Sequence, residues 1–182
     1  MKSIQISPQP CQQLVVIGLS ARDKLGLLLC GNLRFPCALG RSGRRPVKNE
    51  GDGATPMGRF TLRQVLYRAD RVPRPRTLLP VSPLRPDDGW CDAPQDRNYN
   101  RKVRHPYPAS GERLWRSDHL YDLIVVMSHN QSPRVRGRGS AVFLHVAAPG
   151  YAPTEGCIAL RCEHLQRVLT CVAADAVITI GD

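Results

Sequence analysis

Aromatic residues are scarce in this chain of 182 residues, at 5% of the sequence. No apolar run approaches the ~20 residues that a helix needs to cross a bilayer. The cysteines form no CxxC pair, and no Cys and His spacing is typical of a zinc finger. Residues 1–5 are not followed by the apolar stretch and small-residue cleavage site of a secretory signal. These absences argue against a membrane-spanning or zinc-binding protein.

The chain is strongly basic, with a formal net charge of +11 from 26 Lys and Arg against 15 Asp and Glu. An anionic partner such as nucleic acid, a membrane surface or carboxylate-rich cell-wall material would suit this charge, and so would a plainly solvated basic surface. The arginines are scattered, whereas a nucleic-acid module concentrates them on one element or interleaves them with aromatics. We therefore expect no nucleic-acid partner.

Short apolar runs separated by turn residues predict a mainly β protein. The length suits one domain over residues 1–182. Apolar residues recur at helical spacing over 162–173, which predicts one helix with a buried face. Long loops are expected over 41–58 and 70–118, and the Trp and Tyr residues of the second favour an ordered, packed insertion. The expected strands cover residues 13–19, 25–30, 32–39, 59–67, 122–128, 140–146 and 176–180. The sum fits a sandwich or barrel-like β core.

One segment carries residues suited to nucleophilic catalysis. His145 ends an apolar strand, a turn-rich loop follows, and Gly156-Cys157 opens a second apolar run. A thiolate is the reactive form of cysteine, and a histidine within hydrogen-bond reach can take its proton to give a thiolate–imidazolium pair. The backbone N–H groups of Gly156 and Cys157 could then form an oxyanion hole. From spacing alone, both residues could equally be structural.

The remaining cysteines need no catalytic explanation. The chain has seven, an odd number, so at least one stays unpaired if the others pair within the chain. Most are expected to be small buried apolar residues. The spacing of Cys157 and Cys162 allows a redox pair as an alternative, although Cys162 falls at the start of the expected helix.

The segment resembles the signature of the L,D-transpeptidase (YkuD-type) catalytic domain. That signature has a histidine on a strand, a loop, and then Ser/Thr-His-Gly-Cys followed by an apolar residue. Thr154, Gly156, Cys157 and Ile158 match it, and His145 matches the upstream base. Residues 53–60, Gly-Ala-Thr-Pro-Met-Gly-Arg-Phe, are similar to the family's Thr-Pro-x-Gly-x-Phe turn and strand. The resemblance covers about residues 14–180.

The sequence departs from the family pattern at three places. Glu155 replaces the usual histidine before Gly-Cys, Ala159 stands where Arg or Asn is common, and the loop between His145 and Cys157 is shorter than usual. These changes place substrate choice in question more than the Cys/His pair, and they fit a divergent subgroup. Candidate substrate-binding residues are His129, Thr154, Glu155 and Arg161.

The resemblance implies an L,D-transpeptidase-like β-sandwich with one short helix after the catalytic cysteine and a long loop insertion. It implies acyl transfer on peptidoglycan stem peptides through a thioester on Cys157, with His145 as base and a carbonyl near the histidine, here Val146, as its support. No cofactor and no metal are implied. The alternatives are an L,D-carboxypeptidase that hydrolyses the same bond and a non-catalytic cell-wall-binding module. The family implies the cell envelope, while the missing signal leaves the cytoplasm open; the oligomeric state is also open.

Overall fold

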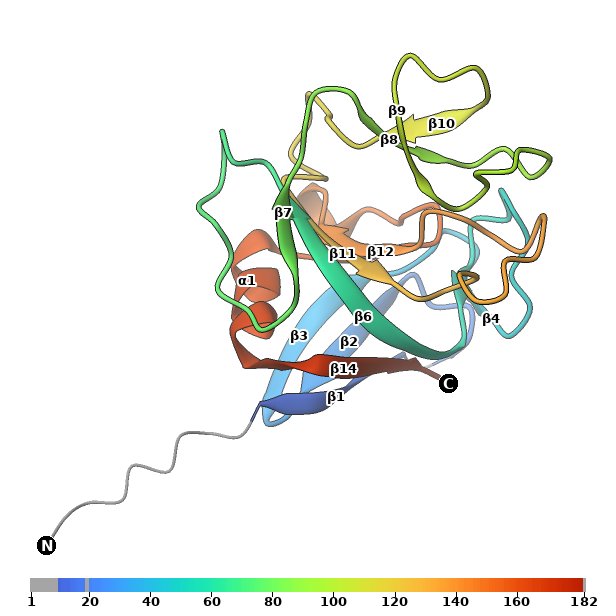
Figure 1. The fold of residues 1–182 in the computed structure, drawn as a ribbon. Coiled ribbons are helices and arrows are strands. Elements are labelled where there is room, and N and C mark those ends of the chain that lie inside the picture. Colours follow the sequence, from blue (N-terminus) through green and yellow to red (C-terminus); the bar gives the residue numbers. More distant parts are fainter. Residues whose placement is uncertain (1–9, 19, 182) are drawn as a thin grey trace, which may run out of the picture.

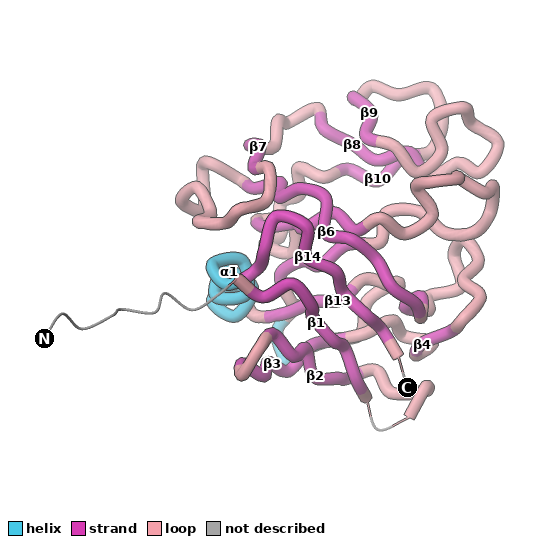
Figure 2. Tube along the Cα trace, turned by 60° about the horizontal axis from the view of Figure 1, so that its bottom comes forward, coloured by secondary structure: helices cyan, strands magenta, loops and turns pink. Residues whose placement is uncertain are grey.

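A nine-stranded sheet organises the protein in the computed structural model, which describes residues 10–18 and 20–181. Strands and loops make up most of the chain (Figure 2). The sheet order is β11-β12-β13-β3-β2-β1-β14-β6-β7. Its strands are β1 (Cys11–Ile17), β2 (Leu25–Cys30), β3 (Leu33–Ala38), β6 (Gly58–Tyr67), β7 (Val81–Pro83), β11 (Leu123–Met127), β12 (Phe143–Val146), β13 (Ile158–Leu160) and β14 (Val172–Ile180).

The long strand β6 closes this sheet on itself. Its residues 58–61 pair with β14, and its residues 62–67 pair with β11, so the two ends of the strand order meet. The two faces of the closed sheet enclose the main core, as in a β-sandwich whose layers share one strand (Figure 1). The fold is therefore mainly β, as the sequence predicts.

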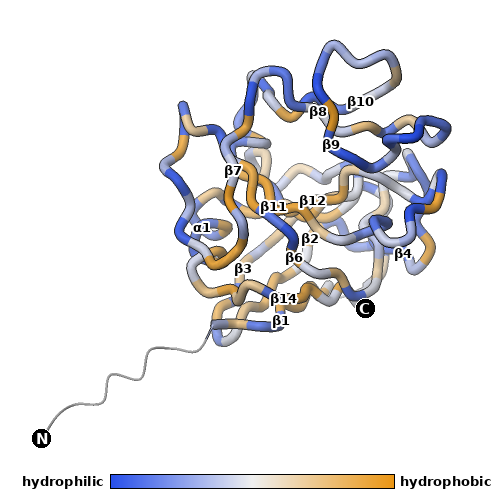
Figure 3. Tube along the Cα trace, viewed as in Figure 1, coloured by the Kyte–Doolittle hydropathy of each residue, from blue (hydrophilic) through white to orange (hydrophobic). Residues whose placement is uncertain are grey.

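Alternating side chains explain which face of each strand is buried. In β1, Leu14 and Val16 are fully buried while Gln13 is exposed, which is the two-residue period of a half-buried strand. β11 is buried on both faces, because the insertion covers its outer side. The hydropathy colouring shows β11 and β12 as apolar strands inside a polar periphery (Figure 3).

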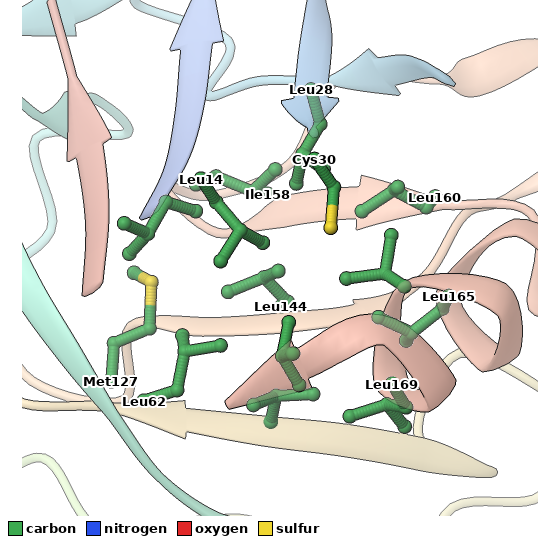
Figure 4. Packing of buried hydrophobic residues seen from close by; sticks show 14 of the residues in the cluster. Leu14, Leu28, Cys30, Leu62, Met127, Leu144, Ile158, Leu160, Leu165 and Leu169 are labelled. Carbon is green, nitrogen blue, oxygen red and sulfur yellow. The ribbon is translucent and has the colours of Figure 1, made fainter. Parts of the chain in front are cut away.

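One α-helix, α1 (Cys162–Cys171), follows β13 within the described residues. Leu165, Val168 and Leu169 form its buried face, and Leu165 and Leu169 point toward Leu144 in the core (Figure 4). The short 3₁₀ turn η1 (Pro149–Tyr151) precedes it in the loop after β12. None of the helices in the described chain combines the length and apolar character needed to span a bilayer.

The region 70–118 is an ordered insertion, as expected, but it contains short strands that the sequence did not indicate. A three-stranded sheet in the order β10-β8-β9 is built from β8 (Asp88–Cys91), β9 (Lys102–Arg104) and β10 (Gly111–Arg113). It lies above the edge of the main sheet near β11 and β12 (Figure 1). Strands of three or four residues with many prolines nearby carry too little periodicity to be recognised. The loop 41–58 likewise holds a two-residue pairing of β4 (Arg44–Arg45) with β5 (Thr55–Pro56).

Several expected boundaries are wrong by a few residues. The helix ends at Cys171 and not at 173, because Val172 takes extended backbone angles (φ −74°, ψ 144°) and already pairs with β1. β14 therefore starts four residues before the expected 176. The strand expected from 140 begins at Phe143, since Ala141 has a positive φ of 50°. Leu19, expected to end the first strand, and residues 1–5, considered for a signal segment, lie outside the described residues.

The core predicts a strong effect of Leu144→Ala. The Leu144 side chain is fully buried on β12, so truncation should lower the free energy of unfolding by about 2–5 kcal/mol through lost burial and a residual cavity. Urea unfolding of the two proteins measures this difference. Leu78→Ala, at a side chain that is 60% exposed, is the control and should change it by less than about 0.5 kcal/mol. Equal effects of the two substitutions would contradict the assigned core.

Candidate active site

The pairing of β12 with β13 brings His145 and Cys157 together. The two strands are parallel, and the register places His145 opposite Ala159. Cys157 directly precedes β13, two residues before Ala159. His145, Ala159 and Cys157 all line one cavity of about 550 Å³. Ala159 contributes only a methyl group to the cavity wall beside the histidine.

Cys157 is held at the wall of the cavity by backbone groups. Its residue is 8% exposed. The Sγ atom lies 3.4 Å from the N–H of Phe143, which donates to it, and 3.2 Å from the carbonyl oxygen of Ala141. The thiol is thus oriented before any ligand arrives.

His145 is oriented as a base that would use Nε2. Its Nδ1 lies 2.8 Å from the carbonyl oxygen of Val146, the support expected from the resemblance. This contact assigns the proton to Nδ1, because a carbonyl oxygen can only accept, and it leaves the Nε2 lone pair available. The ring of Tyr121 packs edge-on at 5.2 Å between centroids. Tautomer and ring plane are therefore both fixed.

Burial keeps both groups neutral in the free protein. Desolvation, together with the charge of Glu112, raises the pKa of Cys157 to about 12, although the Phe143 N–H and the Lys48 charge act in the opposite direction. Desolvation lowers the pKa of His145 to about 4 against the hydrogen bonds to Val146 and Leu120. At neutral pH the resting pair is a thiol and an imidazole. The thiolate–imidazolium pair expected from the sequence is not the resting state.

The loop before Cys157 is fastened by Thr154. Its Oγ1 donates to the carbonyl oxygen of Cys157 at 2.6 Å and accepts from the N–H of Gly156 at 3.1 Å. The backbone of Thr154 also bonds to Leu39 and Arg41. The hydroxyl of this residue, a candidate substrate contact, is thus used inside the loop. One of the two expected oxyanion-hole donors, the Gly156 N–H, is used there as well, whereas the Cys157 N–H makes no hydrogen bond within the described chain.

The Thr-Pro turn of residues 53–56 packs against the same loop. Gly156 has a φ of 132°, and a Cβ there would lie 2.7 Å from the carbonyl oxygen of Ala54. Thr55 donates from Oγ1 to the carbonyl oxygen of Cys157 at 3.4 Å. Only glycine at 156 allows this close approach. The two sequence segments that carry the family resemblance are therefore in direct contact.

Of three other candidate substrate-binding residues, one lines the cavity that contains Cys157 and two do not. Glu155 lines the cavity rim and forms an exposed ion pair with Arg41 at 2.8 Å. His129 does not line the cavity; its Nε2 lies 3.0 Å from the carbonyl oxygen of Arg138, and its ring meets Phe60 edge-on. Arg161 does not line it either, and its guanidinium lies 5.8 Å from the centre of the Tyr151 ring.

The insertion and the loop 41–58 supply cavity residues that the sequence did not identify. Charged side chains of both signs line it: Lys48, Glu50, Asp92, Glu112 and Arg116. Tyr121 both lines the cavity and packs in the core: it is 6% exposed and donates to Glu112 Oε1 at 2.6 Å. Burial raises the pKa of Glu112. These residues lie up to 109 positions from Cys157 and share no motif with it, so no sequence signal linked them.

The structure offers no evident metal or disulfide in the site. Within residues 10–18 and 20–181, no cluster of three or more His, Cys, Asp or Glu side chains is placed to hold a metal ion. All seven cysteines are free, including Cys157 and Cys162.

The buried thiol predicts a characteristic pH dependence of alkylation. Since the pKa of Cys157 is about 12, its thiolate fraction, and with it the rate of reaction with iodoacetamide, should rise about tenfold per pH unit from pH 7 to 9. Peptide mass mapping of timed samples measures the rate at this residue. A short unstructured peptide with one cysteine is the reference, and its rate should level off above the usual thiol pKa of about 8.5. A rate at Cys157 that is already constant at neutral pH would show a preformed ion pair and contradict this assignment.

The comparison with known proteins agrees with the geometry. The protein-family model described as the L,D-transpeptidase catalytic domain (YkuD) matches residues 14–180. No curated protein and no solved structure matched the chain. The matched range extends from β1 into the last residue of β14 and contains both His145 and Cys157. The chain belongs to the L,D-transpeptidase catalytic domain family.

Proposed function

We propose that this protein is a cysteine acyltransferase that carries out L,D-transpeptidation on peptidoglycan stem peptides, with residues 1–182 acting as one catalytic domain. The observation that carries the proposal is the register of β12 and β13, which directs His145 and Cys157 into one cavity. Family membership supports a peptidoglycan-modifying enzyme. The cell envelope, where the family typically works, is the compartment that goes with this function.

The reaction follows from the fixed orientation of the two groups. Nε2 of His145 takes the thiol proton as Sγ of Cys157 attacks the carbonyl carbon of the third, L-configured residue of a tetrapeptide stem. Collapse of the tetrahedral intermediate breaks the bond to the terminal D-Ala, whose amine leaves with the proton from His145. A thioester remains on Cys157. The amine of a second stem then attacks this thioester, and the thiol is regenerated.

The charged side chains of the cavity also suit a peptidoglycan stem peptide as substrate. A stem peptide presents carboxylates and an amine, and complementary charges increase specificity for such a ligand. The cavity offers Lys48 and Arg116 on one hand, and Glu50, Asp92 and Glu112 on the other. The acidic side chains suit an incoming amine, which favours transfer over hydrolysis. L,D-carboxypeptidase activity, in which water resolves the thioester, is the alternative outcome of the same first step.

We expect a carbapenem, a reactive acyl donor, to acylate Cys157 once per molecule. Intact mass should show a stoichiometric adduct on the wild type and none on Cys157→Ala. His145→Ala should slow acylation about 10²–10⁴-fold, the usual contribution of a general base. Cys162→Ala is the matched control, since this half-buried thiol does not line the cavity and its loss should leave the adduct unchanged.

An unmodified wild type, or an adduct that persists in Cys157→Ala, would contradict the proposed function and favour a non-catalytic cell-wall-binding module. Transfer and hydrolysis are separated with a tetrapeptide stem supplied with and without a second stem as acceptor. A new amide-linked product together with released D-Ala is expected. A trimmed tripeptide alone, whatever the acceptor concentration, would identify a carboxypeptidase.

A further inference from the structure

Lys48 is a buried cation next to the proposed nucleophile. Its side chain is 4% exposed, and it lines the cavity that contains Cys157. A Cβ added at Gly139 would lie 2.9 Å from Cδ and Cε of Lys48, and one at Gly156 would lie 2.9 Å from its Nζ. Both glycines have positive φ angles, 91° and 132°. Glycines in two loops thus leave the space that the Lys48 side chain occupies. Its ammonium group lies beside the Gly156-Cys157 peptide.

The ammonium has one N–H left for a ligand. Its Nζ donates to Asp52 Oδ1 and to the carbonyl oxygen of Ala54, each at 2.8 Å. An ammonium has three donors, and the third has no partner among the described residues. Asp52 is itself held by the N–H groups of Asn49 and Ala54. These contacts fix the position of the charge without using its full hydrogen-bonding capacity.

A contribution to the stability of the fold does not by itself explain why a lysine is buried at position 48. Burying an ion pair costs desolvation that its attraction often fails to offset, and an apolar side chain of similar volume is frequently as stable. At the same time the expected oxyanion hole lacks a donor, because the Gly156 N–H is bonded to Thr154 Oγ1. The Cys157 N–H is the remaining backbone donor. A second donor is needed near the same peptide.

We propose that Lys48 Nζ supplies the second oxyanion-hole donor, acting with the backbone N–H of Cys157 on the oxygen of the tetrahedral intermediate. The inference rests on the proposed acyl transfer. In this step the Sγ–C bond forms, the carbonyl π electrons move to oxygen, and the negative charge is stabilised by the ammonium until the leaving amine departs. A preorganised charge in a site shielded from water is effective because it does not reorganise during the reaction.

The resting thiol supports a role on the oxyanion and not on the nucleophile. The charge of Lys48 lowers the pKa of Cys157, yet burial still holds that pKa near 12. Lys48 therefore does not generate a thiolate in the free protein. Its charge is matched to the anion that appears on the acyl group during attack.

Two uncharged reagents distinguish the roles of Lys48. Acylation of Cys157 by p-nitrophenyl acetate passes through an oxyanion, whereas alkylation by iodoacetamide forms none. For Lys48→Met, adduct formation with the ester should fall about 10²–10³-fold, the usual loss for one oxyanion-hole donor, while alkylation should change less than about threefold. Because both reagents lack a carboxylate, binding of a substrate anion by Lys48 cannot produce this difference.

Two further variants control for folding and for total charge. Lys48→Met leaves Asp52 without its cation, so the double variant Lys48→Met/Asp52→Asn restores neutrality and should show the same selective loss. Lys24→Met removes a positive charge from an exposed side chain and should react like the wild type. Equal losses with both reagents, or no loss with either, would overturn the assignment of Lys48. A wild type that the ester does not acylate at Cys157 would instead contradict the proposed function itself.

Discussion

The site depends on the parallel pairing of β12 with β13. These two strands are only four and three residues long, yet their register fixes which side chains share a face. A slip of one residue would turn Cys157 away from His145, because neighbouring side chains of a strand point to opposite sides. β11 and β3 flank the pair, and α1 packs against β12 from the core side. The buried sheet thus defines the position of the chemistry, and the loops complete it.

Burial determines the protonation states of Cys157 and His145. The thiol and the imidazole are both neutral at rest, so in the reaction that we propose, proton transfer between them is coupled to attack on a bound substrate. The Val146 carbonyl and the ring of Tyr121 hold the imidazole in place for that transfer. A nucleophile that is activated only with its substrate in place is protected from stray electrophiles. In the proposed reaction, the charged side chains of the cavity then act on groups that appear only during acyl transfer.

Much of this arrangement follows from the sequence. The apolar runs predict the main strands and the one helix, because strand and helix periods are strong over those segments. The His145 and Gly156-Cys157 pattern identifies the candidate pair, and the Thr-Pro turn of residues 53–56 indicates the segment that packs on it. These features are local, so a single chain segment carries each of them.

The rest depends on contacts between distant segments. Lys48 lies in a loop and Glu112 on the short strand β10 of the insertion, and only the folded chain brings them to the cavity that contains Cys157. The hydrogen bond from the Gly156 N–H to Thr154 Oγ1 removes one donor from the expected oxyanion hole. No residue pattern in the sequence predicts this bond. Likewise, Arg41 engages Glu155 from 114 positions away. Such pairings follow from tertiary packing, which local periodicity does not encode.

The proposed function requires that Cys157 carries the acyl group of a peptidoglycan stem. The most direct measurement is a rapid acid quench of the protein with a tetrapeptide stem, followed by mass mapping of the peptide that contains Cys157. We expect a thioester-linked tripeptide acyl group on this residue, labile to hydroxylamine, together with one released D-Ala for each thioester formed. Release of D-Ala with no acyl group ever present on Cys157, or acylation of another residue, would contradict it.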